Sequence, residues 1–115
     1  MASTDTHRPN ILFILSDDQG AWAMNCAGTP ELKTPNLDRL AETGIRFENF
    51  FCASPVCSPA RASILTGQIP SQHGVQDFLR AGNSVDLPGD GKTIQYLEGR
   101  TTYTEILGDN GYDVA

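Results

Sequence analysis

Short apolar runs alternate along this chain with segments whose apolar residues have helical spacing. Residues 11–15 are continuously apolar and stop at polar residues and a glycine, which predicts a buried strand that ends in a loop at Asp17 and Asp18. Residues 45–52 predict a second strand, and residues 112–115 begin a third. Strands that alternate with helices favour an α/β fold with a largely parallel sheet.

Two helices are marked by start and stop signals outside the middle of the chain. Residues 35–43 follow Thr34, which can cap a helix, and precede Gly44, which can end one. Residues 102–109 predict another helix, which ends in a left-handed turn at Gly111.

The middle of the chain contains one further helix signal. Residues 58–66 predict a helix with Ser58 as its cap, Pro59 at its first position and Gly67 just past its end. Residues 68–92 are rich in proline and glycine, so we expect no regular element there.

Composition and charge narrow the classes of function. A chain of 115 residues with 39% apolar content can bury one modest core. Its net charge of −6 argues against nucleic acid as a partner, and its apolar runs are far shorter than the roughly 20 residues of a membrane span. Three cysteines are too few for a disulfide framework, and Cys52 with Cys57 supplies only one of the two ligand pairs of a structural zinc site. The few strands lead us to expect a fragment of a larger sheet.

The stretch "CSPARASILTG" places Cys57 at a predicted helix start and Arg61 about one turn further on. A helix N-terminus favours a nearby anion, and the guanidinium of arginine suits a tetrahedral oxyanion such as sulfate or phosphate. Residue 57 is therefore a candidate nucleophile toward an oxyanion ester. The alternative interpretation is a small buried thiol beside a solvated charge. A thiol phosphatase fits less well, since its cysteine and arginine lie six apart around a glycine-rich loop.

Asp17 and Asp18 are adjacent carboxylates at the end of the first predicted strand. Neighbouring residues of a strand point to opposite faces, so both can reach one ion only if the strand has already ended. The loop beyond the carboxyl end of a strand meets this condition, and carboxylate oxygens suit Ca²⁺ or Mg²⁺. The alternative is an ordinary turn or helix cap.

The stretch from residue 57 to residue 67 resembles the signature of the type I sulfatases at every fixed position: Cys57, Pro59, Arg61, Thr66 and Gly67. The segments "PNILFILSDDQG", "TPNLDRLAETGIRFENFF" and "YTEILGDNGYDVA" also resemble that family. The resemblance implies an alkaline-phosphatase-like, doubly wound α/β sheet flanked by helices. It further implies that residues 1–115 are the N-terminal portion of a sulfatase catalytic domain.

The resemblance also implies a mechanism. A maturation enzyme, the formylglycine-generating enzyme, oxidises Cys57 to formylglycine, an aldehyde that hydrates to a geminal diol. One diol oxygen attacks sulfur and expels the substrate alcohol; the second hydroxyl then loses its proton, restores the aldehyde and ejects sulfate. Ca²⁺ (Mg²⁺ is the alternative) is held by Asp17, Asp18 and the modified residue 57, and Arg61 stabilises the negative charge.

Other family parts, among them a "GKWHLG"-like segment, do not occur in this sequence. We therefore expect weak calcium binding and no turnover from this chain alone, since Ca²⁺ takes six to eight oxygen ligands. A second chain is a possible carrier of the missing parts. The resemblance favours a periplasmic or secreted location, although no export signal is recognisable in the sequence.

The implied substrate is a sulfated sugar or an aryl sulfate. Candidate substrate-binding residues follow the signature in a predicted loop, and the alternative for the histidine is an ordinary surface residue. Two other functions stay open: a phosphonate or phosphate ester hydrolase of the same superfamily, and a catalytically silent structural or binding fragment. The candidate substrate-binding residues are His73, Gln76, Asp77 and Arg80.

Overall fold

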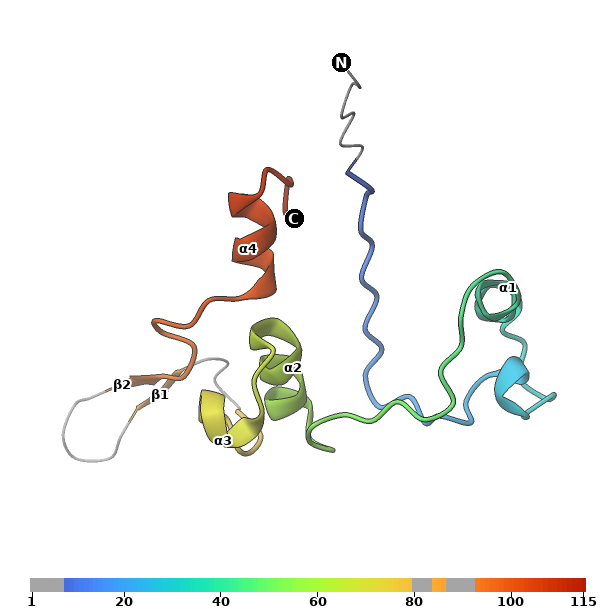
Figure 1. The fold of residues 1–115 in the computed structure, drawn as a ribbon. Helices are drawn as coiled ribbons and strands as arrows, with labels where there is room; N and C mark the ends of the chain where they lie inside the picture. The colour runs from blue at the N-terminus through green and yellow to red at the C-terminus, as the bar shows by residue number, and fades with distance from the viewer. Residues whose placement is uncertain (1–7, 80–83, 87–92) are drawn as a thin grey trace, which may run out of the picture. The chain divides into compact units, whose positions relative to one another are not determined.

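The computed structural model describes residues 8–79, 84–86 and 93–115 (Figure 1). These residues fall into two compact units, Met1–Phe47 and Glu48–Ala115, each of which is described by itself. The first unit contains a short 3₁₀ helix η1 (Asn25–Ala27) and helix α1 (Pro35–Thr43). The second contains α2 (Cys57–Thr66), α3 (Pro70–His73), β1 (Ser84–Asp86), β2 (Thr93–Gln95) and α4 (Tyr103–Asp109).

Helix α1 has the bounds that the sequence predicts. Pro35 opens it, and the N–H of Gly44 bonds to the carbonyl of Leu40 at its end. The expected role of Thr34 was wrong, because its side chain does not cap the helix. Its hydroxyl instead accepts the N–H of Asn25 at 3.0 Å.

Asp38 joins η1 to α1. Its carboxylate accepts hydrogen bonds from the Asn25 side chain at 3.0 Å, the Cys26 N–H at 3.0 Å and the Thr34 hydroxyl at 3.1 Å. These bonds, led by that from Asn25, lower the pKa of the Asp38 carboxyl. The pKa of the Cys26 thiol is raised, by burial first and then by the neighbouring carboxylate.

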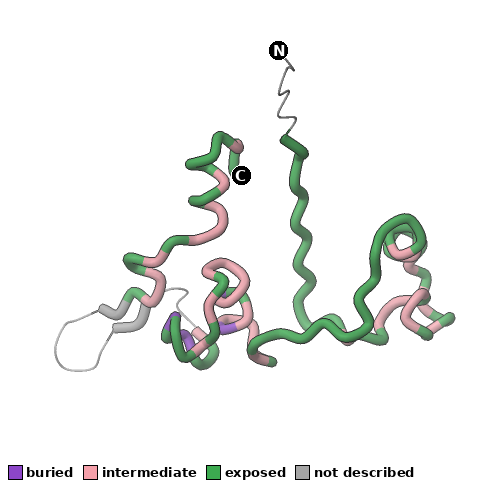
Figure 2. Tube along the Cα trace, in the orientation of Figure 1, coloured by how far each residue is buried: buried purple, intermediate pink, exposed green. Residues whose placement is uncertain are grey.

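The predictions of strands at 11–15, 45–52 and 112–115 were wrong, since none of these segments is a strand in the described structure. An extended segment becomes a strand only when a neighbour satisfies its backbone groups. The apolar side chains of these segments are largely exposed, from 42% at Leu15 to 85% at Phe51, and Figure 2 shows the extended N-terminal segment as exposed. The parallel sheet is likewise absent from the described residues, whose one sheet is the antiparallel pair β1–β2 with Val85 opposite Ile94.

Helix α2 begins one residue earlier than predicted. Val56 is its cap, so Cys57 is its first residue, Ser58 is not the cap and Pro59 is its third residue. Gly67 ends it in the left-handed conformation, with φ of 67°, as expected.

The small core of the second unit lies where α2 meets α3. Ala62 is 4% exposed, Val75 2% and His73 1%, and Pro59 is also buried (Figure 2). Helix α2 contacts α3 and α4. The expectation of no regular element over 68–92 was wrong, because α3 and β1 lie within that range.

Helix α4 confirms the helix predicted at 102–109, and it starts with a capping box. The Thr102 hydroxyl accepts the N–H of Glu105, and the Glu105 carboxylate accepts the N–H of Thr102 at 2.7 Å. Gly111 is left-handed, as predicted, with φ of 80°. No helix among the described residues is long and apolar enough to cross a membrane.

Candidate functional site

Cys57 occupies the first position of α2, at the helix N-terminus. The first intrahelical hydrogen bond runs from the N–H of Ala60 to the carbonyl of Val56 at 3.0 Å, so the N–H groups of Cys57 and Ser58 have no acceptor within the helix. Val56 supplies no capping side chain. The positive end of the helix dipole therefore acts directly at residue 57 and favours negative charge there.

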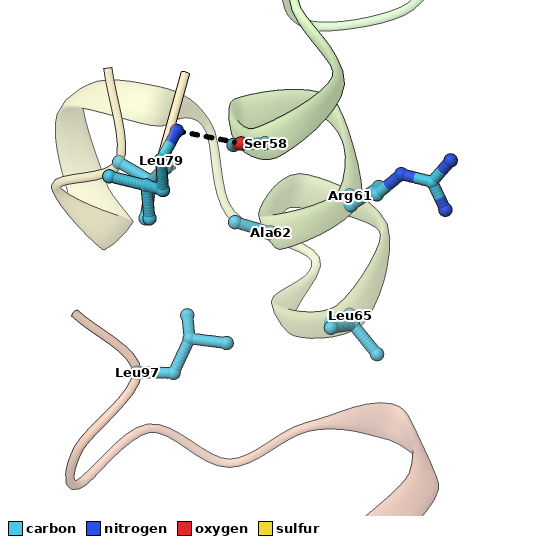
Figure 3. A pocket seen from close by; sticks show the side chains of 7 residues that line it. Ser58, Arg61, Ala62, Leu65, Leu79 and Leu97 are labelled. Atoms are coloured by element: carbon cyan, nitrogen blue, oxygen red, sulfur yellow. Dashed lines mark hydrogen bonds between the residues drawn. The ribbon is translucent and has the colours of Figure 1, made fainter. Parts of the chain in front are cut away.

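Arg61 lies four residues later, on the same face of α2 as Cys57. It is exposed, and Figure 3 shows its guanidinium extending outward from the helix. Beside it lies a hollow of about 180 Å³. The walls of this hollow are mostly aliphatic, so the Arg61 guanidinium and the Ser58 hydroxyl are its polar groups. It is lined by Ser58, Arg61, Ala62, Leu65, Val75, Leu79 and Leu97.

The expected loop position of His73, and the alternative of an ordinary surface residue, were wrong, because His73 is a buried residue of α3. Its candidate role in binding substrate stays a prediction. Its Nε2 lies 3.0 Å from the Ser63 hydroxyl oxygen, and its Nδ1 accepts the N–H of Val75 at 3.1 Å. Burial lowers the pKa of His73, and the positive charge of Arg100 lowers it further. The pairing with Ser63 was missed, because nothing in the sequence links these two positions.

The other residues proposed for substrate binding follow α3. Gln76 and Asp77 are exposed, and the Asp77 carboxylate accepts the N–H of Phe78 at 2.7 Å. Arg80 lies outside the described residues. A role of these residues in binding substrate stays a prediction.

Asp17 and Asp18 belong to the first unit, and both are exposed. Asp18 has φ of 53° and is the one residue other than glycine with positive φ in the described structure. A left-handed residue interrupts the alternation of an extended chain, which is the local condition that two adjacent carboxylates need to face one ion.

The donor chemistry of this pair fits a hard cation such as Ca²⁺ or Mg²⁺. The described residues contain no group of three or more His, Cys, Asp or Glu side chains that could hold a metal ion. Two carboxylates are fewer oxygen ligands than the six to eight that Ca²⁺ takes. Their role as metal ligands together with residue 57 stays a prediction.

A family model described as Sulfatase matches residues 9–115. The chain therefore belongs to the sulfatase family, which implies an alkaline-phosphatase-like α/β fold. No solved structure matches the chain.

Curated relatives point the same way. The chain is 35% identical to human steryl-sulfatase over 94% of its own length and 18% of that protein. It is 48% identical to human N-acetylgalactosamine-6-sulfatase over 64% of the chain and 14% of that protein. With N-acetylglucosamine-6-O-sulfatase of Bacteroides thetaiotaomicron it shares 36% identity over 96% of the chain and 17% of that protein. The chain thus spans less than a fifth of the length of these relatives, all of which are named as sulfatases.

Proposed function

We propose that this chain supplies the nucleophile-bearing part, residues 1–115, of a sulfatase catalytic domain that hydrolyses sulfate esters. The observation that supports it most is the position of Cys57 at the start of α2, with Arg61 one turn further on, inside the region matched by the Sulfatase model. The substrate class is a sulfated sugar or an aryl sulfate, in keeping with the names of the relatives.

Residue 57 carries the nucleophile after a formylglycine-generating enzyme has oxidised the thiol. When present, formylglycine supplies a hydrated aldehyde whose hydroxyl attacks the sulfur of the ester. The α2 N-terminus and the Arg61 guanidinium both favour negative charge, so they stabilise the ionised hydroxyl and the sulfate oxygens. An unmodified Cys57 is nearly inactive in this scheme. An ester formed on its sulfur has no second hydroxyl whose ionisation would expel the sulfate, as the diol has.

Asp17 and Asp18 hold Ca²⁺, with Mg²⁺ as the alternative, in this proposal. Their carboxylates have the oxygen chemistry that these ions prefer, and the left-handed backbone of Asp18 frees the pair from strand alternation. Bound there, the cation supplies Lewis-acid chemistry toward a sulfate oxygen. Gln76, Asp77 and Arg80 are proposed to contact the remainder of the substrate, and a second chain is a possible source of further site residues.

Mass spectrometry of residue 57 tests the proposal. The chain is co-expressed with a formylglycine-generating enzyme and digested with trypsin, which releases residues 47–61 as one peptide containing Cys52 and Cys57. We expect loss of H₂S and gain of oxygen at residue 57, with Cys52 unchanged as the internal control and Cys57→Ala as the blank. A thiol retained at residue 57, while a reference sulfatase peptide is converted in the same cells, contradicts the proposal.

Activity supplies the second arm of the test. Protein that carries the modification is combined with a chain that supplies the missing parts of the catalytic domain. It is then assayed with a matched pair of esters, an aryl sulfate and an aryl phosphonate. Preference for the sulfate ester supports the proposed substrate class, and preference for the phosphonate contradicts it.

A further inference from the structure

The hydrogen bonds of His73 determine its tautomer. The N–H of Val75 can only donate, so Nδ1, which lies 3.1 Å from it, is the unprotonated nitrogen. The proton of the neutral ring therefore sits on Nε2, and this N–H donates to the Ser63 hydroxyl oxygen at 3.0 Å. Ser63 and His73 are thus not a nucleophile and its base, because the histidine nitrogen facing the hydroxyl is a donor.

This bond fastens the segment 70–79 to α2 at His73, and a second bond does so at Leu79. The second runs from the N–H of Leu79 to the Ser58 hydroxyl at 3.0 Å (Figure 3). Between them the buried side chains of Ala62 and Val75 fill the contact. The segment 70–79 is therefore fixed to α2 at His73 and at Leu79.

We propose that His73 is a positioning residue: as the neutral Nε2–H tautomer it clamps the segment 70–79 to α2 through Ser63 and so fixes the position of that helix. The relevance to catalysis rests on the proposed function, since residue 57 and Arg61 are carried by that helix. The clamp itself is independent of it.

Protonation would disrupt the bond to Val75, which lies within the segment 70–79, and would leave the Nε2–H donor of the clamp in place. A second proton would have to enter on Nδ1, where it would meet the N–H of Val75, and two donors would then face each other. The charged groups on the surrounding elements are Arg61 on α2, Asp77 after α3, and Glu98 and Arg100 after β2. Burial is the first cause that disfavours a positive charge on His73, and Arg100 is the second, whereas a hydrogen bond with the backbone of Pro59 favours the charged ring.

Two substitutions of His73 separate its bond to Ser63 from its bond to Val75. The side-chain amide of Gln at residue 73 places a donor where Nε2 lies, whereas Asn places an acceptor where Nδ1 lies, and neither group titrates in this range. His73→Gln is therefore expected to keep the tie to Ser63 at every pH. His73→Asn is expected to lose it.

The experiment is nuclear magnetic resonance of the chain labelled with ¹⁵N, together with hydrogen exchange. At pH 7.5 we expect the ¹⁵N signals of His73 to show a protonated Nε2 and an unprotonated Nδ1. At the same pH, the protection factors of the α2 amides are expected to be about five- to tenfold lower in His73→Asn, as for the loss of one hydrogen bond, and the amide signals of residues 57–61 to shift with them. In His73→Gln the α2 protection stays at the level of the unsubstituted chain.

The opposite tautomer in the unsubstituted chain overturns the proposal whatever the variants do. Equal loss of α2 protection in His73→Gln and His73→Asn also overturns it, since that outcome indicates a role in packing alone. In protein that carries formylglycine and is combined with a chain that supplies the missing parts of the catalytic domain, we expect kcat for an aryl sulfate to fall in His73→Asn and to be retained in His73→Gln, with KM unchanged. Absence of sulfatase activity in this combined, unsubstituted protein would contradict the proposed function and leave the clamp to be judged by the resonance data.

Discussion

The N–H of Leu79 donates to the hydroxyl of Ser58, at 3.0 Å, although 21 residues separate them in the chain. This bond fastens the first turn of α2, which carries Cys57, to a segment beyond α3. The Ser58 side chain therefore acts between two parts of the second unit and not as the cap of its own helix.

Replacing Ser58 by Ala leaves the Leu79 N–H without this acceptor. We expect local stability to fall by about 1–3 kcal/mol, the usual cost of an unsatisfied donor at a partly buried position. Hydrogen exchange at Leu79 and in the first turn of α2 measures it. Ser71→Ala, at an exposed position of α3, is the matched control. Unchanged exchange at Leu79 would show that the bond contributes nothing.

The stability of the second unit is expected to depend on pH through His73. Its pKa is lowered in the folded chain, by burial first, while the unfolded chain has a value near 6.5. As the pH falls below about 6.5, the unfolded state takes up the proton first, so the free energy of unfolding decreases until the folded pKa is passed. Hydrogen exchange of α2 amides between pH 8 and 5 follows this decrease, and His73→Gln removes it.

The Glu105 carboxyl affects the pH dependence of stability in a separate, more acidic pH range. Its pKa is lowered mainly by the N–H of Thr102, so its contribution is present above its unfolded value of about 4.3 and is lost as the pH falls below that value. A decrease in α2 protection that began only in this range would contradict the assignment to His73.

Thr102→Ala removes the side chain that caps α4. The hydroxyl accepts the N–H of Glu105 and bonds to the Glu105 carboxylate at 2.9 Å. We expect a loss of about 1 kcal/mol in the stability of this helix. Exchange of the Glu105 and Ile106 amides reports it, and the exposed neighbour Thr101, changed to Ala, is the control. Equal effects of the two substitutions would argue against capping.

Asp18 is expected to show opposite effects on stability and on metal binding. Glycine removes the cost of left-handed backbone at this position, so Asp18→Gly is expected to stabilise the first unit by about 0.4–1 kcal/mol. It also removes one of two carboxylates, so the weak Ca²⁺ binding expected of the chain, with a Kd of about 10⁻³ M or weaker, should be lost.

Calcium titration calorimetry and thermal unfolding measure the two effects separately. Glu31→Gln, an exposed carboxylate of the same unit, is the control for loss of one negative charge. Calcium binding by Asp18→Gly as strong as that of the unsubstituted chain would contradict the proposed metal role.

Asp38→Asn is expected to change the reactivity of Cys26. Burial is the main cause of the raised pKa of this thiol, but the Asp38 carboxylate adds to it through a hydrogen bond and its charge. Without that charge, the pH at which alkylation of Cys26 reaches half its maximal rate should move down. Peptide mass spectrometry after timed alkylation measures it, with Cys52 as the internal control. A rate change with no shift in that midpoint would indicate only an opened loop.

Helices and left-handed turns could be predicted where residues within one turn of the chain determine them. Helix α1 has its predicted bounds, α2 differs by one residue, and Gly67 and Gly111 are left-handed as expected. Proline, capping residues and glycine act within one turn of the chain, so their effect can be read without knowledge of the fold. The stretch from residue 57 to residue 67 was likewise sufficient to indicate the family that the wider comparison confirms.

The strands could not be predicted in this way, because an apolar run forms a strand only when it pairs within a sheet, and residues 11–15 and 45–52 are not part of a sheet in the described structure. The capping role of Ser58 failed for a related reason: its hydroxyl accepts a donor that lies 21 residues away.

The sequence by itself determined the family, the placement of Cys57 and Arg61 at one helix end, and the helices whose signals are local. Only the tertiary structure decided that His73 is buried, that its Nδ1 accepts the N–H of Val75, and that its Nε2 lies beside the Ser63 hydroxyl. The physical reason is that burial and hydrogen-bond partners are properties of residues brought together from separate parts of the chain, and spacing along one segment carries no information about them.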